Sequence, residues 1–180
     1  MTENALPMST RSGSRSRPWV RVIAVTTIAA AGLLLSGCSI LNQITNTTPR
    51  DPSGTATAEN DDANVFSIKV GDCLNDATAT GTVTTAPITP CSKPHDSEAY
   101  KSIVMASGTF PGEDAVKSQA DQGCADAFPD FVGISYDDSD LSISYYFPTS
   151  DSWANGDREI LCTVYDDGVK TTGTLKGAAR

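Results

Sequence analysis

The chain has 180 residues, of which 39% are hydrophobic, and 13 Lys and Arg face 22 Asp and Glu, for a net charge of −9. A surface this acidic repels phosphate groups, so the composition excludes a nucleic-acid-binding protein. Residues 65–180 suffice for one small domain with one hydrophobic core and are too few for two.

Residues 1–37 have the pattern of a secretory signal. A short apolar run over residues 22–35 follows four basic residues, Arg11, Arg15, Arg17 and Arg21. The run is shorter than the about 20 residues that span a bilayer. It ends at Leu35-Ser36-Gly37-Cys38, where a small residue precedes a cysteine as in bacterial lipoprotein precursors. We therefore predict a lipoprotein signal peptide and an acylated Cys38 that anchors the chain at the extracytoplasmic face of the cell membrane. An ordinary secretory signal or an uncleaved anchor is the alternative.

Residues 38–64 are interpreted as the lipidated Cys38 followed by a disordered tether. The segment is rich in Thr, Asn, Asp, Ser and Pro and shows no apolar period of 2 or 3.6. Removal of residues 1–37 takes away four basic residues and one acidic residue. Nine basic residues then face twenty-one acidic ones, which gives a net charge of −12. Such a chain fits a soluble domain held above a membrane.

The remaining residues, 65–180, are predicted to form one extracytoplasmic domain. Phe66, Ile68 and Val70 alternate as on one face of a first strand, and residues 100–105 indicate another. Apolar and polar residues alternate again over residues 141–147. A hairpin is predicted from residues 159–165 and 169–175, which flank the turn residues 166–168.

One helix is predicted from about Glu113 to Phe128, with acidic residues in its first turn and Pro129 just past its end. Val116, Ala120 and Cys124 fall at helical spacing, so one stripe should pack on a sheet. The expected fold class is α+β, with a small, mostly antiparallel sheet packed by one main helix.

Four cysteines besides Cys38 fit an exported protein with two disulfides, although four cysteines allow three connectivities. We favour Cys73 with Cys91, which closes a Thr-rich loop. We also favour Cys124 with Cys162, because the apolar stripe of the helix would then be joined to a strand face. A zinc site is the alternative, but the chain has no CxxC pair to supply the spacing of metal ligands. We predict no cofactor.

Residues 90–98 contain the single histidine, His95, followed by Asp96 and Glu98. Imidazole and carboxylates could converge there as metal ligands or as a general base. The alternative is a rigid loop between two prolines in which His95 bonds to the backbone near a disulfide. Because the sequence has no HExxH, GxSxG, SxxK or Gly-rich phosphate loop, we do not expect an enzyme.

Two further segments contain residue types that could bind a ligand or a partner. Residues 136–140 form an acidic turn that lacks the glycine and distal glutamate of an EF-hand loop, so a solvated turn is favoured over a calcium site. Residues 153–158 place Trp153 and Arg158 near each other, and these residue types are common binding anchors. In the alternative reading, Trp153 caps the edge of the core, residues 155–156 form the turn, and Arg158 pairs with Asp157.

These motifs together resemble the septum formation domain family, which occurs in actinobacterial membrane proteins and lipoproteins. The resemblance covers nearly all of residues 65–180 and rests on a GDC motif, a PCxxPHxxE motif, a helix cysteine and a WxxGDR motif before a last cysteine. The resemblance implies a role in division-septum or cell-envelope processes. It implies no particular catalytic activity or ligand. The matching residues are Gly71, Asp72, Cys73, Cys91, Pro94, His95, Glu98, Cys124, Trp153, Gly156, Asp157, Arg158 and Cys162.

Two functional hypotheses follow. In the first, the chain is a lipid-anchored interaction module that binds an envelope protein or a cell-wall polymer. Its binding surface would combine two loops, with His95, Asp96 and Glu98 on one and Trp153, Gly156, Asp157 and Arg158 on the other. In the second, the chain is a metal- or small-solute-binding lipoprotein that uses His95, Asp96 and Glu98.

Overall fold

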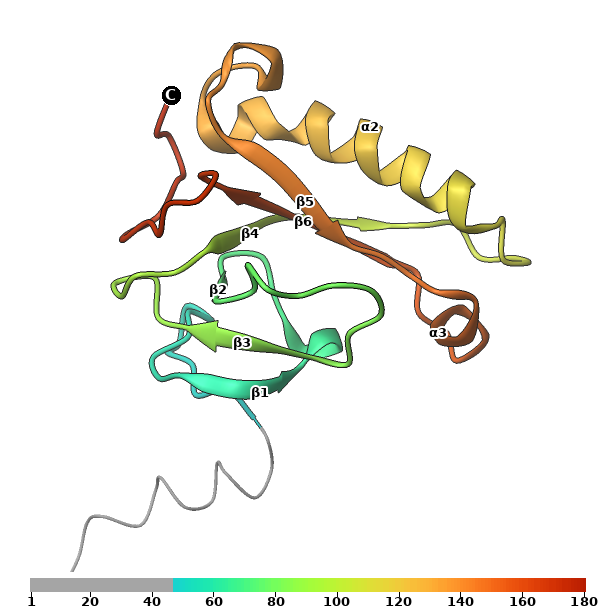
Figure 1. Cartoon of the computed structure of the whole chain (residues 1–180). Coiled ribbons are helices and arrows are strands. Elements are labelled where there is room, and N and C mark those ends of the chain that lie inside the picture. The colour runs from blue at the N-terminus through green and yellow to red at the C-terminus, as the bar shows by residue number, and fades with distance from the viewer. Residues whose placement is uncertain (1–46) are drawn as a thin grey trace, which may run out of the picture. The chain divides into compact units, whose positions relative to one another are not determined.

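The computed structural model describes residues 47–180, so the predicted signal peptide and Cys38 lie outside the described residues. Six strands form one antiparallel sheet in the order β1-β3-β2-β4-β6-β5 (Figure 1). The strands are β1 (Asn60–Asn64), β2 (Cys73–Leu74), β3 (Thr85–Thr89), β4 (Ser97–Val104), β5 (Ser142–Tyr146) and β6 (Glu159–Tyr165). The helices are α2 (Glu113–Val132) and the short α3 (Ser150–Ala154), with 3₁₀ turns η1 (Val65–Ser67) and η2 (Tyr136–Asp138). Among residues 47–180, no helix is long and apolar enough to cross a membrane.

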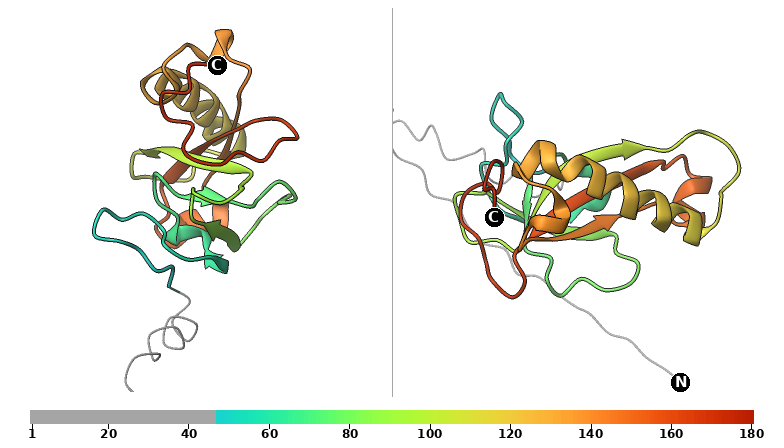
Figure 2. Two further views of the ribbon diagram at one scale, coloured as in Figure 1. Left: turned by 90° about the vertical axis from the view of Figure 1, so that its left-hand side faces the viewer. Right: turned by 90° about the horizontal axis from the view of Figure 1, so that it is seen from above.

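The predicted α+β class is confirmed, because α2 is the main helix and packs on the β4-β6-β5 half of the sheet (Figure 2). The buried residues of α2 recur every four positions and form its apolar stripe: Val116, Ala120, Cys124, Phe128 and Val132. They join one hydrophobic cluster with Tyr100, Ile160 and Val164. A second cluster lies around β1, β2 and β3 and includes Ala63, Leu74 and Ile88.

Helix α2 is one turn longer than predicted, since it continues through Pro129 to Val132. A proline inside a helix removes one backbone donor and strains the preceding turn. Phe128 and Val132, on either side of it, are both fully buried, and their burial offsets this loss. The helix ends at Val132 and is capped by Gly133, whose φ of 98° is left-handed and whose N–H donates to the carbonyl of Pro129. The prediction that the helix ends before Pro129 is therefore wrong.

The segment predicted as a disordered tether is folded over its described part. Strand β1 pairs with β3 and buries Ala63 completely, and Ala56 is 4% exposed. The carboxylate of Asp72 accepts hydrogen bonds from both terminal nitrogens of Arg50, at 2.5 and 2.6 Å. The domain thus begins near Thr48 rather than at residue 65. The sequence did not predict this folded segment because buried alanines and polar contacts keep it on the domain. Neither of these produces an apolar period in the sequence.

The first predicted strand is a 3₁₀ turn instead. The side chain of Asn64 accepts a hydrogen bond from the backbone N–H of Phe66 at 2.9 Å and caps η1. Of the three alternating apolar residues, only Ile68 is buried, whereas Phe66 is 64% exposed and Val70 is 52% exposed. The alternation was therefore misleading here.

The strands predicted over residues 100–105 and 141–147 are confirmed as β4 and β5. The predicted hairpin partner over residues 169–175 is not a strand. Strand β6 pairs with β4 on one edge and β5 on the other, so no edge remains for it. Residues 169–175 instead make single bridges, from Asp166 to Val169 and from His95 to Thr171.

Candidate functional site

Both predicted disulfides are present. Cys73 bonds to Cys91 across 18 residues and joins β2 to the loop after β3. Cys124 bonds to Cys162 across 38 residues and joins α2 to β6, as the stripe of the helix predicted. In the described part of the chain, one group of metal-ligand side chains lies within 4.8 Å of one another, namely Cys73, Cys91 and Glu98. The two sulfurs are bonded to each other, so this group does not offer thiolate ligands.

The imidazole of His95 is fully buried and bonded through both nitrogens. Nδ1 lies 2.9 Å from the carbonyl oxygen of Lys93 and donates to it, and Nε2 lies 3.0 Å from the hydroxyl of Thr171. The backbones of His95 and Thr171 also exchange two hydrogen bonds of 2.9 Å. His95 therefore fastens the C-terminal segment to the start of β4.

The two carboxylates that follow His95 are also engaged. Glu98 is 2% exposed, and its two oxygens accept from the hydroxyl of Thr174 and the N–H of Leu175, each at 2.7 Å. Asp96 pairs with Lys170 at 2.6 Å. A metal at this loop would have to replace these bonds, so the geometry favours the rigid-loop interpretation over the metal-binding one.

The acidic residues 136–140 are exposed apart from the half-buried Ser139, and form η2 with its flanking turn. The hydroxyl of Ser135 donates to the carboxylate of Asp138 at 2.6 Å. This arrangement is typical of a solvated turn.

The Trp153 motif is built on α3, whose start is fixed by a capping box between Thr149 and Ser152. Trp153 is 6% exposed, and its indole N–H donates to the carbonyl of Gly108 at 2.8 Å. The ring of Phe110 meets it edge-on, with centroids 5.6 Å apart. Trp153 thus joins α3 to the loop between β4 and α2.

The residues after Trp153 hold the ring in place. Gly156 has a φ of 97°, which favours glycine, and its N–H donates to the carbonyl of Trp153 at 3.0 Å. The carboxylate of Asp157 accepts from the hydroxyl of Ser152 at 2.8 Å and from the N–H of Glu159 at 3.0 Å. The guanidinium of Arg158 lies 3.7 Å from the ring centre of Trp153. This agrees with the structural interpretation of Trp153 at the core edge, but Arg158 stacks on the ring and bonds to the backbone carbonyl of Asp157 instead of pairing with its carboxylate.

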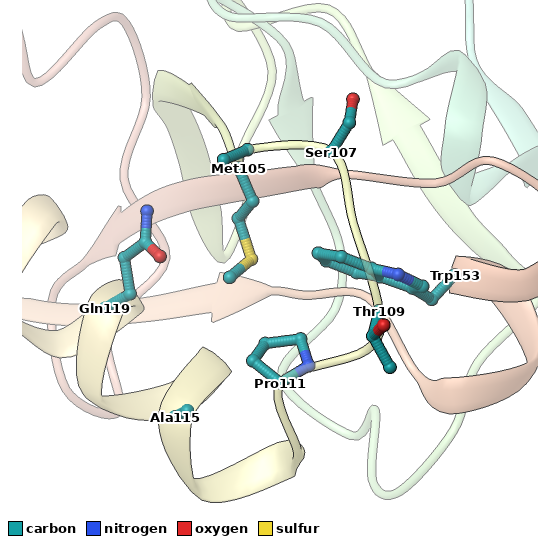
Figure 3. A pocket seen from close by; sticks show the side chains of 8 residues that line it. Met105, Ser107, Thr109, Pro111, Ala115, Gln119 and Trp153 are labelled. Carbon is teal, nitrogen blue, oxygen red and sulfur yellow. The ribbon is translucent and has the colours of Figure 1, made fainter.

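A hollow of about 300 Å³ opens beside Trp153, between the loop after β4 and the first turns of α2 (Figure 3). Its apolar wall includes Met105, Pro111 and Trp153, and exposed hydroxyl and amide groups stand at its rim. The lining residues are Met105, Ala106, Ser107, Thr109, Pro111, Ala115, Gln119 and Trp153. Only Trp153 among them was a predicted site residue. The others were missed because they carry no chemical motif, and the loop is recognisable only by its Gly and Pro content.

The two predicted loops do not form one surface. The His95 loop precedes Ser97 at one end of β4, whereas Met105, which bonds to the carbonyl of Arg158, follows Val104 at the other end. Eight strand residues separate them by about 25 Å, at about 3.3 Å per residue. We take the hollow at Trp153 as the candidate site, with Gly156, Asp157 and Arg158 as its support.

The family model described as septum formation matches residues 35–162. The match includes both disulfides, the His95 loop and the whole Trp153 motif. Neither the curated proteins nor the solved structures contain a significant match to the chain.

Proposed function

The chain belongs to the septum formation family, and from this premise we propose that it is a lipid-anchored interaction module of the cell envelope. Membership supports a role in septum or cell-wall processes. The proposal adds that Cys38 carries the anchor and that the hollow at Trp153 binds an envelope protein or a cell-wall polymer.

The hollow is the observation that carries this proposal. It combines a buried aromatic ring with exposed groups that can contact a partner, namely Ser107, Thr109 and Gln119. Aromatic residues that are fixed in place make good binding anchors because little side-chain entropy is lost on binding. The ring of Trp153 is fixed by Arg158, Phe110 and the carbonyl of Gly108.

The lining residues favour binding over catalysis. None of the eight side chains in Figure 3 is an acid, a base or a cysteine, so the hollow offers apolar contact and hydrogen bonds. Exposed acidic residues adjoin it in the sequence at Asp114 and Asp151. A neutral or basic partner therefore suits this surface better than an acidic one.

The test uses a fluorescent fusion of the full-length chain in dividing cells. We expect enrichment at the septum relative to a uniform membrane dye. Cys38→Ala should release the protein from the membrane. Ala115→Arg places a long side chain in the hollow and should leave the protein on the membrane but abolish septal enrichment.

Ser118→Arg is the matched control, because Ser118 is exposed on the same helix and does not line the hollow. It should behave as wild type, and both arginine variants should keep the wild-type melting temperature. A uniform membrane signal for the wild type would disprove the septal role. Equal loss of enrichment in both variants would remove the assignment of the hollow.

A further inference from the structure

The chain enters the folded domain at one fixed place. Thr48 is 5% exposed, and its hydroxyl accepts a hydrogen bond from Asn60 on β1 at 3.1 Å. The carbonyl of Pro49 accepts from Thr57 at 2.9 Å, and Arg50 is held by Asp72. Whatever lies before Thr48 therefore leaves the domain beside β1.

This place must stay near the membrane if Cys38 carries lipid, a condition that rests on the proposed function. Nine residues lie between Cys38 and Thr48, so the chain takes ten residue steps from one to the other. A chain of that length spans at most about 33 to 36 Å, whatever its conformation. The β1 side of the domain is thus kept within reach of the lipid surface. The opposite end of the sheet is β5, where α2 packs.

An exposed apolar turn lies beside the entry point. Phe66 is 64% exposed and Val70 is 52% exposed. A terminal nitrogen of Arg50 donates to the carbonyl of Ser67, next to Phe66, at 3.3 Å. The exposed Lys69 stands between the two apolar side chains in sequence. An aromatic and an aliphatic side chain near a lysine are a combination that interfacial membrane contacts use.

We propose that Phe66 and Val70 insert into the outer surface of the membrane that holds the anchor. The contact would orient the domain with β1 toward the lipid and the β5-α2 side away from it. The attraction comes from burial of the two apolar side chains and not from charge. Exposed Asp51 and Asp61 lie nearby, and anionic head groups would repel them. The single anchor supplies the high local concentration that such a small contact requires.

The experiment uses the mature chain, lipidated at Cys38, in phosphatidylcholine vesicles with and without brominated acyl chains. Tryptophan is placed at the turn in Phe66→Trp and, in a second variant, in Val70→Trp. Val104→Trp is the matched control, since Val104 is 75% exposed and lies at the far end of β4. Trp153 is common to all three proteins and supplies a constant background.

We expect brominated lipid to remove roughly half of the added emission at positions 66 and 70, because interfacial side chains reach about 5 to 10 Å into the boundary of the acyl region. The emission added at position 104 should be unchanged. Equal quenching at all three positions, or none at any, in a protein that floats with the vesicles would overturn the proposed contact alone. A protein that does not float at all would overturn the lipid anchor and this inference with it.

Discussion

The guanidinium of Arg158 stacks on the indole of Trp153, with its central carbon 3.7 Å from the ring centre. One terminal nitrogen also donates to the carbonyls of Trp153 and Asp157, at 2.8 and 2.5 Å. The planar guanidinium lies flat on the ring while its N–H groups point outward in its plane toward the carbonyls, and the compact ammonium group of lysine does not reproduce this geometry. The relationship explains why arginine follows the Gly156-Asp157 turn.

Arg158→Lys should therefore loosen Trp153 although the charge is kept. We expect a loss of about 1 to 2 kcal/mol in the free energy of unfolding, from the lost stacking and hydrogen bonds. Trp153 is the sole tryptophan after residue 19. Its emission in the protein without residues 1–37 should shift to the red, and urea unfolding gives the stability.

The control is Arg180→Lys, because Arg180 is paired with Asp166 at an exposed position. This change should alter stability by less than about 1 kcal/mol. If Arg158→Lys left both the emission and the unfolding midpoint at wild-type values, the stack would have no role in holding Trp153.

Arg50→Ala tests whether residues 47–57 belong to the folded domain. Asp72 is 1% exposed, and the hydrogen bonds between the two side chains raise the pKa of Arg50. Removing one partner of a buried ion pair leaves the other charge without compensation, which costs about 3 to 5 kcal/mol. We expect a loss near the lower bound, because Asp72 keeps its bond from the N–H of Lys69 at 2.8 Å.

The measurement is urea unfolding, with Lys117→Ala as the control. Lys117 pairs with Glu113 on the surface of α2, and such i,i+4 pairs contribute about 0.3 to 0.5 kcal/mol. Equal small losses in both variants would mean that residues 47–57 behave as the predicted tether.

The contrast between α2 and β1 shows what sequence patterns can predict. The stripe of α2 buries five side chains at helical spacing, and this spacing predicted the helix. The place of Cys124 on the stripe predicted its disulfide with Cys162. Strand β1 buries only Ala63, and polar residues occupy its other four positions. Such a strand has no apolar period, so it is recognised only from its pairing with β3 in the structure.

The candidate site shows a similar limit. Trp153 and Arg158 were predicted as site residues from their chemical type, and the structure places them in contact. The hollow was not predictable, because its walls come from a loop and from α2, which only the tertiary fold brings together. His95 was ambiguous for the opposite reason, since its burial and its bond to Thr171 depend on a segment 76 residues away.

The two disulfides should contribute unequally to stability. Loop-closure entropy predicts about 3 kcal/mol for the 18-residue separation of Cys73 and Cys91, and about 4 kcal/mol for the 38-residue separation of Cys124 and Cys162. Both Cys124 and Cys162 are also fully buried, so alanines there leave a cavity.

Urea unfolding of the two paired alanine variants measures the difference. The Cys124→Ala/Cys162→Ala protein should be the less stable of the two and should retain less helical signal, because α2 loses its bond to β6. The reverse order would contradict the entropy argument.

Tyr100 should make the domain lose stability in alkali. It is 5% exposed, its hydroxyl donates to the carbonyl of Cys124 at 2.6 Å, and burial raises its pKa far above the ordinary value. The pKa in the unfolded chain is about 10. The stability is therefore fully present below pH 10 and falls as the pH rises above it, by at most about 1.4 kcal/mol per pH unit for this group. Burial likewise raises the pKa of Tyr146, which bonds to Asp76.

Urea unfolding between pH 8 and pH 11 gives the slope for the wild type, for Tyr100→Phe and for the variant that also carries Tyr146→Phe. Tyr100→Phe should lose about 1 kcal/mol at pH 8, because the carbonyl of Cys124 loses its donor. Above pH 10, however, its stability should fall less steeply than that of the wild type, and the double variant should fall less steeply still. Parallel curves for all three proteins would show that neither buried tyrosine controls the alkaline unfolding.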